Sequence, residues 1–147
     1  MIDAAVKHAG FVMVHAAIVA SVLESKDFLC PFAVITRGAN RQSIEFEAES
    51  QDEAIAEPWA SLDELRDNVD LWAMAREGLL STSSGKFDAL VVAAWGCGMP
   101  EATPFVQRFI GRGETFRLAG PVEVQSELSP DELSTWRRWF HEGINTE

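Results

Sequence analysis

The residue with the clearest potential for nucleophilic chemistry is Cys97. It lies between Gly96 and Gly98, directly after an unbroken apolar run, and the flanking glycines would expose its sulfur and present backbone N–H groups. A catalytic thiol needs a base or a cation beside it. The chain has three histidines, none at a spacing diagnostic of a Cys–His pair: His8, His15 and His141. Cys97 is therefore a candidate nucleophile, with a structural thiol as the alternative.

Acidic side chains form a second candidate site. From Glu45 to Asp70 the chain carries ten acids and one base, so this acidic stretch contributes −9 to a net charge of −11. At its start, glutamates alternate with apolar residues, as in a strand with one solvated face. Same-face residues lie roughly 6.8 Å apart on a strand, which suits contact with a basic surface better than one bound ion. The predicted partner-binding residues are Glu45, Glu47, Glu49, Asp52 and Glu53, and a solvated face without a partner is the alternative.

Metal and cofactor sites are not predicted. His8 and His15 are seven residues apart, about 10.5 Å along a helix, which is too far for both to bind one ion. The Gly96–Gly98 segment lacks the third glycine of a dinucleotide-binding loop, and paired-cysteine zinc spacing is absent. Five arginines could bind a carboxylate or phosphate or pair with the acidic stretch: Arg108, Arg112, Arg117, Arg137 and Arg138.

Charge and cysteine usage restrict the possible partners and compartment. A net charge of −11 repels phosphate, so we predict binding neither to nucleic acid nor to a membrane surface. Cys30 and Cys97 are far apart and fit a reducing compartment, in which both are expected to be free, buried thiols. The apolar segment Ala9–Leu23 is shorter than the ~20 residues that span a bilayer. We therefore expect a cytoplasmic protein whose first helix belongs to the fold, with His15 in the core or at an interface.

The apolar run Leu90–Trp95 predicts a central strand that is covered on both faces, because a half-buried strand would alternate. Helices are expected over 3–25 and from Ser129 to about His141, the latter with a capping box and with Gly143 past its end. Short helices are expected after Ser50 and Ser61. Further strands are expected over 32–37, 43–49, 104–110 and 114–124, with an edge position for the strand that contains Pro121. Residues 69–75 fit either a strand or a helix, and we favour a strand, followed by a bulge at 76–78 and a flexible loop at 81–85.

This order predicts one α+β domain over 1–147. Its sheet is expected to be mainly antiparallel, with about five or six strands, and the long N-terminal helix and the C-terminal helix pack on it. The length and the apolar content are sufficient for a core without metal or disulfide.

Three functions fit these features. The leading hypothesis is a non-enzymatic protein-binding module, expected to be a homodimer, whose acidic face holds a basic protein partner as an immunity-like antagonist or a chaperone does. The alternative is a small-molecule enzyme or ligand-binding domain with a pocket at the Gly96–Pro100 turn, bordered by Trp95 and an arginine. The third is a structural subunit whose apolar first helix completes an assembly.

Overall fold

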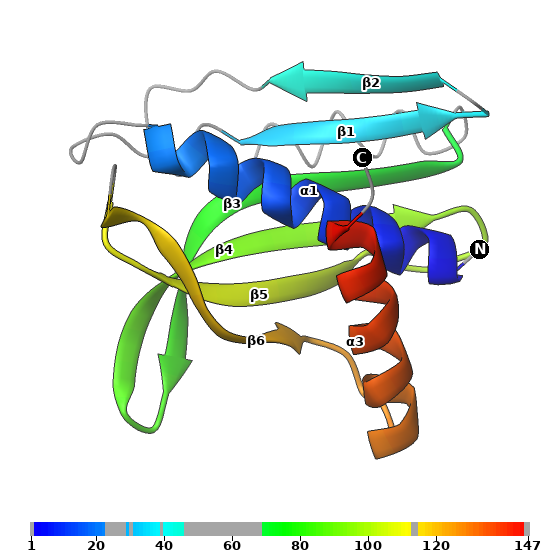
Figure 1. The fold of residues 1–147 in the computed structure, drawn as a ribbon. Coiled ribbons are helices and arrows are strands. Elements are labelled where there is room, and N and C mark those ends of the chain that lie inside the picture. The colour runs from blue at the N-terminus through cyan, green and yellow to red at the C-terminus, as the bar shows by residue number, and fades with distance from the viewer. Residues whose placement is uncertain are drawn as a thin grey trace.

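A computed structural model describes residues 2–22, 29, 31–38, 40–45, 69–112 and 115–145, with the backbone alone at 44 and 45. Two helices and six strands occur in these ranges (Figure 1). They are α1 (Ile2–Val22), β1 (Phe32–Arg37), β2 (Asn40–Glu45), β3 (Leu71–Thr82), β4 (Gly85–Gly96), β5 (Thr103–Ile110), β6 (Arg117–Val124) and α3 (Pro130–Ile144). The predicted α+β class is confirmed.

The six strands form one sheet in the order β2-β1-β3-β4-β5-β6, and every neighbouring pair is antiparallel. Both α1 and α3 lie across the same face of this sheet (Figure 1). The predicted central run Leu90–Trp95 belongs to β4, which pairs with β3 and β5 and is buried on both faces. The strand with Pro121 is β6 at the sheet edge, as predicted.

The main core lies between the helices and the sheet. Alternate residues of β4, Leu90, Val92 and Ala94, face it together with Phe105 of β5. Phe140 of α3 is fully buried there, and its ring centroid lies 5.4 Å from that of Phe105. The intervening residues of β3 and β4 form a second cluster on the opposite face. In this cluster Trp72 and Trp95 stack at 6.4 Å.

The two helices cross at two glycines. A Cβ atom on Gly10 would lie 2.0 Å from the carbonyl oxygen of Phe140, and one on Gly143 would lie 1.8 Å from that of Lys7. Gly143 therefore lies inside α3 and allows the two backbones to touch, so its predicted place past the helix end is wrong. At the other end of α3, Ser129 and Glu132 form the predicted capping box.

The β3–β4 hairpin is longer and more regular than predicted. Arg76, Glu77 and Gly78 continue in register opposite Val91, Leu90 and Ala89, so the expected bulge is wrong. The expected flexible loop is a two-residue turn at Ser83 and Ser84, where the Ser84 N–H donates to the Thr82 hydroxyl at 3.1 Å. Twelve residues of β3 pair with twelve residues of β4, and this pairing orders the segment that its composition suggested would be flexible.

Several predicted boundaries move. The return strand begins at Asn40 rather than Ser43, and β6 begins at Arg117 rather than Glu114. The last residues of the predicted strand 43–49 and the short helices after Ser50 and Ser61 lie outside the described residues. The ladder between β5 and β6 shifts register between Val106 and Arg108.

The first helix is less buried than its composition suggests. It is long and apolar enough to cross a membrane, but length and composition alone are weak evidence that it does so. Half of its most apolar 18-residue segment is buried inside the protein. Its outer side exposes Ile18 and Val22, at 59% and 79% of their surface. His15 is also exposed, with its ring centroid 4.7 Å from that of Phe11. Its place in the core is therefore wrong, and its place at an interface stays a prediction.

His8 is the buried histidine of α1, and it predicts a pH dependence of stability. Its Nε2 lies 2.8 Å from the carbonyl oxygen of Val34, to which it donates, and burial lowers its pKa despite this bond. Below about pH 6.5 the unfolded chain therefore takes up a proton that the folded chain does not, and the free energy of unfolding falls until the folded-state pKa is reached.

Urea titrations between pH 7.5 and 5 measure this dependence. His8→Gln keeps an N–H donor and is expected to flatten the slope by up to about 1.4 kcal/mol per pH unit. His15→Gln removes an exposed imidazole from the same helix and is the matched control for the substitution itself. Equal slopes for wild type and His8→Gln would show that this imidazole protonates equally in both states.

Candidate functional site

The predicted acidic site is largely outside the described residues. Glu45 ends the edge strand β2, where its backbone alone is described, and Glu47, Glu49, Asp52 and Glu53 lie beyond it. Asp70, the last acid of the acidic stretch, has a local role, because its Oδ2 accepts a 2.6 Å hydrogen bond from the Gly38 N–H. This bond ties the β1–β2 turn to the start of β3.

Cys97 lies in the tight turn that follows β4, and its side chain is exposed. The prediction that it is a buried thiol is therefore wrong, and Cys30 lies outside the described residues. Hydrogen bonds of backbone and side-chain groups hold this turn. The Cys97 N–H donates to the Asp70 carbonyl at 2.9 Å, the Met99 N–H donates to the Gly96 carbonyl at 2.9 Å, and the Trp95 indole donates to the Met99 carbonyl at 2.8 Å. The thiol is thus displayed on a well-defined backbone, as the flanking glycines predicted.

A hollow of about 300 Å³ lies beside this turn. We call it the turn hollow. Its described lining comes from the turn, the start of α1, the segment after β6 and α3: Ile2, Gly98, Met99, Pro100, Glu101, Ala102, Thr103, Gln125, Ser126 and Trp136. This lining differs from the predicted one, which was a pocket bordered by Trp95 and an arginine. Trp136 lines the hollow instead of Trp95, and no arginine is among these lining residues.

The other predicted polar residues have separate partners. Arg112 pairs with Glu77 at 2.9 Å, Arg108 stacks 3.6 Å from the Phe87 ring centroid, and Arg137 donates to the Val122 carbonyl at 3.3 Å. Arg117 is exposed, and Arg138 lies 4.0 Å from Glu142. Within the described ranges no group of three or more His, Cys, Asp or Glu side chains could hold a metal ion.

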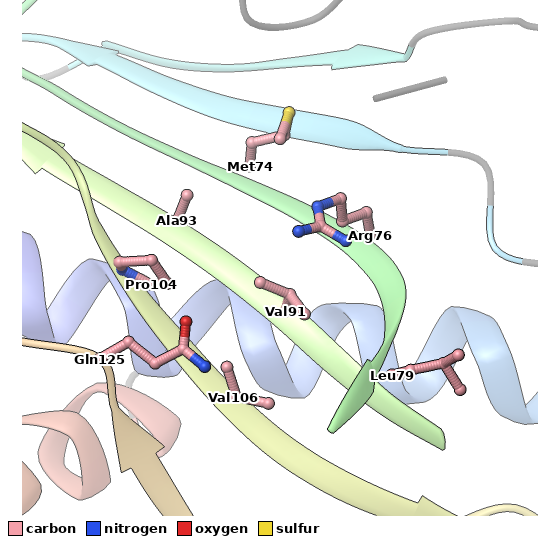
Figure 2. Close-up of a pocket in the computed structure, with 8 residues that line it drawn as sticks. All are labelled: Met74, Arg76, Leu79, Val91, Ala93, Pro104, Val106 and Gln125. Carbon is pink, nitrogen blue, oxygen red and sulfur yellow. The ribbon is translucent and has the colours of Figure 1, made fainter. Parts of the chain in front are cut away.

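A second cavity, which the sequence did not indicate, lies on the sheet face opposite the helices. We call it the Arg76 cavity, of about 130 Å³. Figure 2 shows eight residues around it from β3, β4, β5 and the segment after β6: Met74, Arg76, Leu79, Val91, Ala93, Pro104, Val106 and Gln125. Direct cross-strand pairs build its floor, with Met74 opposite Ala93, Arg76 opposite Val91 and Val106 opposite Val91 on the other side. The floor of the cavity is therefore formed by the adjacent strands β3, β4 and β5.

Arg76 is the one cation among these lining residues. In Figure 2 its guanidinium lies over the sheet between the side chains of Met74 and Val91. Its Nη1 donates to the Glu77 carbonyl at 3.2 Å, and no described Asp or Glu side chain forms an ion pair with it. Burial lowers the pKa of Arg76, although the group stays fully charged at physiological pH.

Gly78 makes room for this guanidinium. A Cβ atom on Gly78 would lie 3.0 Å from Arg76 Nη1 and 3.0 Å from a methyl carbon of Val91. Gly78 follows Arg76 by two residues in β3 and so lies on the same face of the sheet. The missing side chain leaves the space into which the arginine folds back.

The Arg76 cavity combines an apolar wall with one cation, which is the chemistry that binds a small organic carboxylate. Aliphatic side chains of Val91, Val106 and Met74 could contact a hydrocarbon part, and the guanidinium could offer a planar pair of N–H donors to two carboxylate oxygens. A cavity of about 150 Å³ accommodates benzene, so the volume of this cavity, about 130 Å³, is sufficient for roughly six non-hydrogen atoms.

The spacing of residues in β3 contains a signal for this site, although no site was predicted from it. Trp72, Met74 and Arg76 occupy alternate positions of β3, so the arginine follows two buried residues on one face. A charged residue at a half-buried position that continues a buried face of a strand, with a glycine two residues later, departs from a purely structural pattern. The expectation of a bulge at 76–78 hid this departure, since a bulge would have turned Arg76 away from that face.

No family model, curated protein or solved structure matches this chain, and its function is therefore inferred from the residues of the site.

Proposed function

We propose that this chain is a ligand-binding module that captures a small organic monocarboxylate in the Arg76 cavity. The observation that carries this proposal is a half-buried guanidinium, without an acidic partner among the described residues, beside the aliphatic side chains that line part of a cavity. The carboxylate of the ligand supplies the counter-ion, and the aliphatic wall of β4 and β5 binds its hydrocarbon part.

Desolvation favours this interpretation over a structural role for Arg76. A cation that is partly removed from water loses hydration energy unless an anion or several acceptors replace the water. Among the described residues, one carbonyl oxygen, that of Glu77, accepts from the five N–H donors of Arg76. A bound carboxylate satisfies two more of them in a charge-assisted geometry.

A titration with butyrate tests the proposal. Butyrate has about six non-hydrogen atoms and is expected to bind with a dissociation constant in the range of about 1 mM, because so small a ligand gains little contact area. Backbone-amide NMR should show shifts at Val91, Ala93 and Val106. Butyramide has the same shape without the charge and should bind about tenfold more weakly.

Two arginine variants complete this test. Arg76→Met keeps the hydrocarbon stem and should weaken butyrate binding about 10- to 100-fold. The exposed Arg117→Gln removes the same charge far from the cavity and should leave binding unchanged. Arg76→Met is also expected to keep or raise the free energy of unfolding, by up to about 1 kcal/mol, because it removes an unpaired, partly buried charge. Equal binding of butyrate to wild type and Arg76→Met, or a clear loss of stability, would contradict the proposal.

A second function, the capture of a basic protein partner, is favoured by the charge of the acidic stretch. Ten acids against one base between Glu45 and Asp70 attract a cationic surface and accelerate its association. The test is to replace Glu47, Glu49, Asp52 and Glu53 with glutamine and to capture partners from cells with both proteins. The partner should bind wild type with an affinity that falls steeply with salt, and it should be lost with the variant. Salt-independent capture would contradict this second function.

The homodimer and the cytoplasmic location remain proposals of their own. The exposed apolar side chains Ile18 and Val22 of α1 are available to a second copy. Light scattering of wild type and of Ile18→Gln measures the mass of the particle directly. A monomer in both cases would contradict the proposed dimer.

A further inference from the structure

We infer that the ligand is an extended monocarboxylate, whose carboxylate binds Arg76 and whose hydrocarbon chain passes Gln125 into the turn hollow. This inference rests on the proposed function of the Arg76 cavity and adds the length and direction of its ligand. It also assigns a role to the turn hollow, because a ligand confined to the Arg76 cavity would not occupy that space.

The two spaces share a wall. Gln125 lines both the Arg76 cavity and the turn hollow. Pro104 of the cavity and Thr103 of the hollow are consecutive residues at the start of β5. The Gln125 N–H donates to the Pro104 carbonyl at 3.0 Å, which fixes the backbone at this boundary. The Gln125 side chain is exposed, and an exposed side chain changes rotamer quickly, so it can move aside for a ligand that extends from one space to the other.

The lining of the turn hollow fits the far end of such a ligand. Met99, Ala102 and Trp136 provide an apolar surface that includes a partly buried indole. Glu101 also lines the hollow and repels a second carboxylate there. With Arg76 in one space and Glu101 in the other, a ligand with a single carboxylate has one favoured direction.

Size also favours joint occupation. The Arg76 cavity, at about 130 Å³, lies below the roughly 300–1,000 Å³ of common small-molecule sites. Together with the turn hollow, at about 300 Å³, it falls inside this range. A straight-chain acid of about eight carbons extends beyond the first space and requires the second.

A chain-length series tests this inference. Butyrate, hexanoate and octanoate are titrated into the wild-type protein, and the affinity should rise about fourfold for each methylene that leaves water. The terminal methyl of octanoate should give nuclear Overhauser contacts to the Trp136 ring. Suberate, which has a carboxylate at each end, should bind less tightly than octanoate because of Glu101.

A blocking variant locates the chain. Ser126 is exposed and lines the turn hollow, so Ser126→Trp fills that space without disturbing the core. It should reduce octanoate affinity about 250-fold, to that of butyrate, and leave butyrate affinity unchanged. The adjacent, exposed Glu127 is not among the lining residues, and Glu127→Trp is the matched control, which should bind both acids as wild type does.

The outcomes separate the two proposals. If none of the acids binds, the proposed function is wrong and this inference with it. If butyrate binds but affinity does not rise with chain length, the proposed function stands and the extended ligand is wrong. The extended ligand is equally wrong if octanoate binds Ser126→Trp as tightly as wild type.

Discussion

Gly143→Ala is expected to lower the free energy of unfolding by about 3 kcal/mol, through a collision between two helix backbones. The new Cβ would lie 1.8 Å from the carbonyl oxygen of Lys7, which belongs to the backbone of α1 and cannot rotate away as a side chain does. To relieve this overlap, α1 and α3 must separate, and the core between them then loses contact. Gly10→Ala meets the carbonyl oxygen of Phe140 at 2.0 Å and should behave in the same way.

The sign of this effect is as informative as its size. Helix propensity alone predicts that Gly→Ala inside a helix stabilises by about 1 kcal/mol. Ser134→Ala on the exposed side of α3 is the matched control and should change stability by no more than about 0.5 kcal/mol. Urea unfolding followed by circular dichroism measures all three variants. Stabilisation by Gly143→Ala would mean that the helices do not cross at these glycines.

Phe140→Ala is expected to cost about 3–5 kcal/mol, the largest effect of any single substitution considered for this chain. Phe140 is fully buried and stacks on Phe105, so its removal leaves a cavity between α3 and the sheet. The backbones of α1 and α3 are already in contact at Gly10 and Gly143 and cannot approach further to fill it. For a chain of this length the melting temperature should fall by roughly 10–15 °C.

Phe140→Leu is the graded control for this prediction. Leucine keeps most of the apolar volume, so the loss should be about 1–1.5 kcal/mol. Thermal unfolding followed by circular dichroism distinguishes the two losses. Similar losses for alanine and leucine would indicate that the ring stacking with Phe105, rather than the filled volume, dominates this position.

The core and the Arg76 cavity lie on opposite faces of the same strands. Val91 and Ala93 of β4 face the cavity, while Leu90, Val92 and Ala94 face the helices. Substitutions at Arg76 therefore alter the cavity without touching the helix-covered core, so the proposed binding can be tested separately from the stability of the fold. It also means that the precision of the site comes from the central hairpin of the sheet and not from loops.

Local patterns in the chain predicted the elements that depend on neighbouring residues. The unbroken apolar run Leu90–Trp95 indicated a central strand, because a strand covered on both faces needs no polar alternation. The Ser129–Glu132 capping box located the start of α3, because its hydrogen bonds span three residues. The α+β class followed from the order of these elements.

Errors arose where a residue acts through a distant part of the chain. Gly143 looks like a helix terminator, because a glycine near a helix end commonly has that role, and its contact with Lys7 is invisible in the local pattern. The Ser81–Gly85 segment looks flexible in composition, yet long pairing between β3 and β4 closes it into a tight turn. In the sequence, Arg76 resembles a polar interruption of a strand. The structure shows that it continues the strand and pairs with Val91 of β4.

The sequence by itself determined the helix and strand types, the α+β class, the central strand and the acidic charge of this protein. These properties depend on composition and on spacings of a few residues, which the chain carries in any conformation. The tertiary structure alone decided that α1 and α3 cross backbone to backbone, that Cys97 is exposed, and that Arg76 meets apolar residues of two other strands at a cavity. Strand order, register and helix crossing bring those groups together, and they are set by packing between segments that are far apart in the chain.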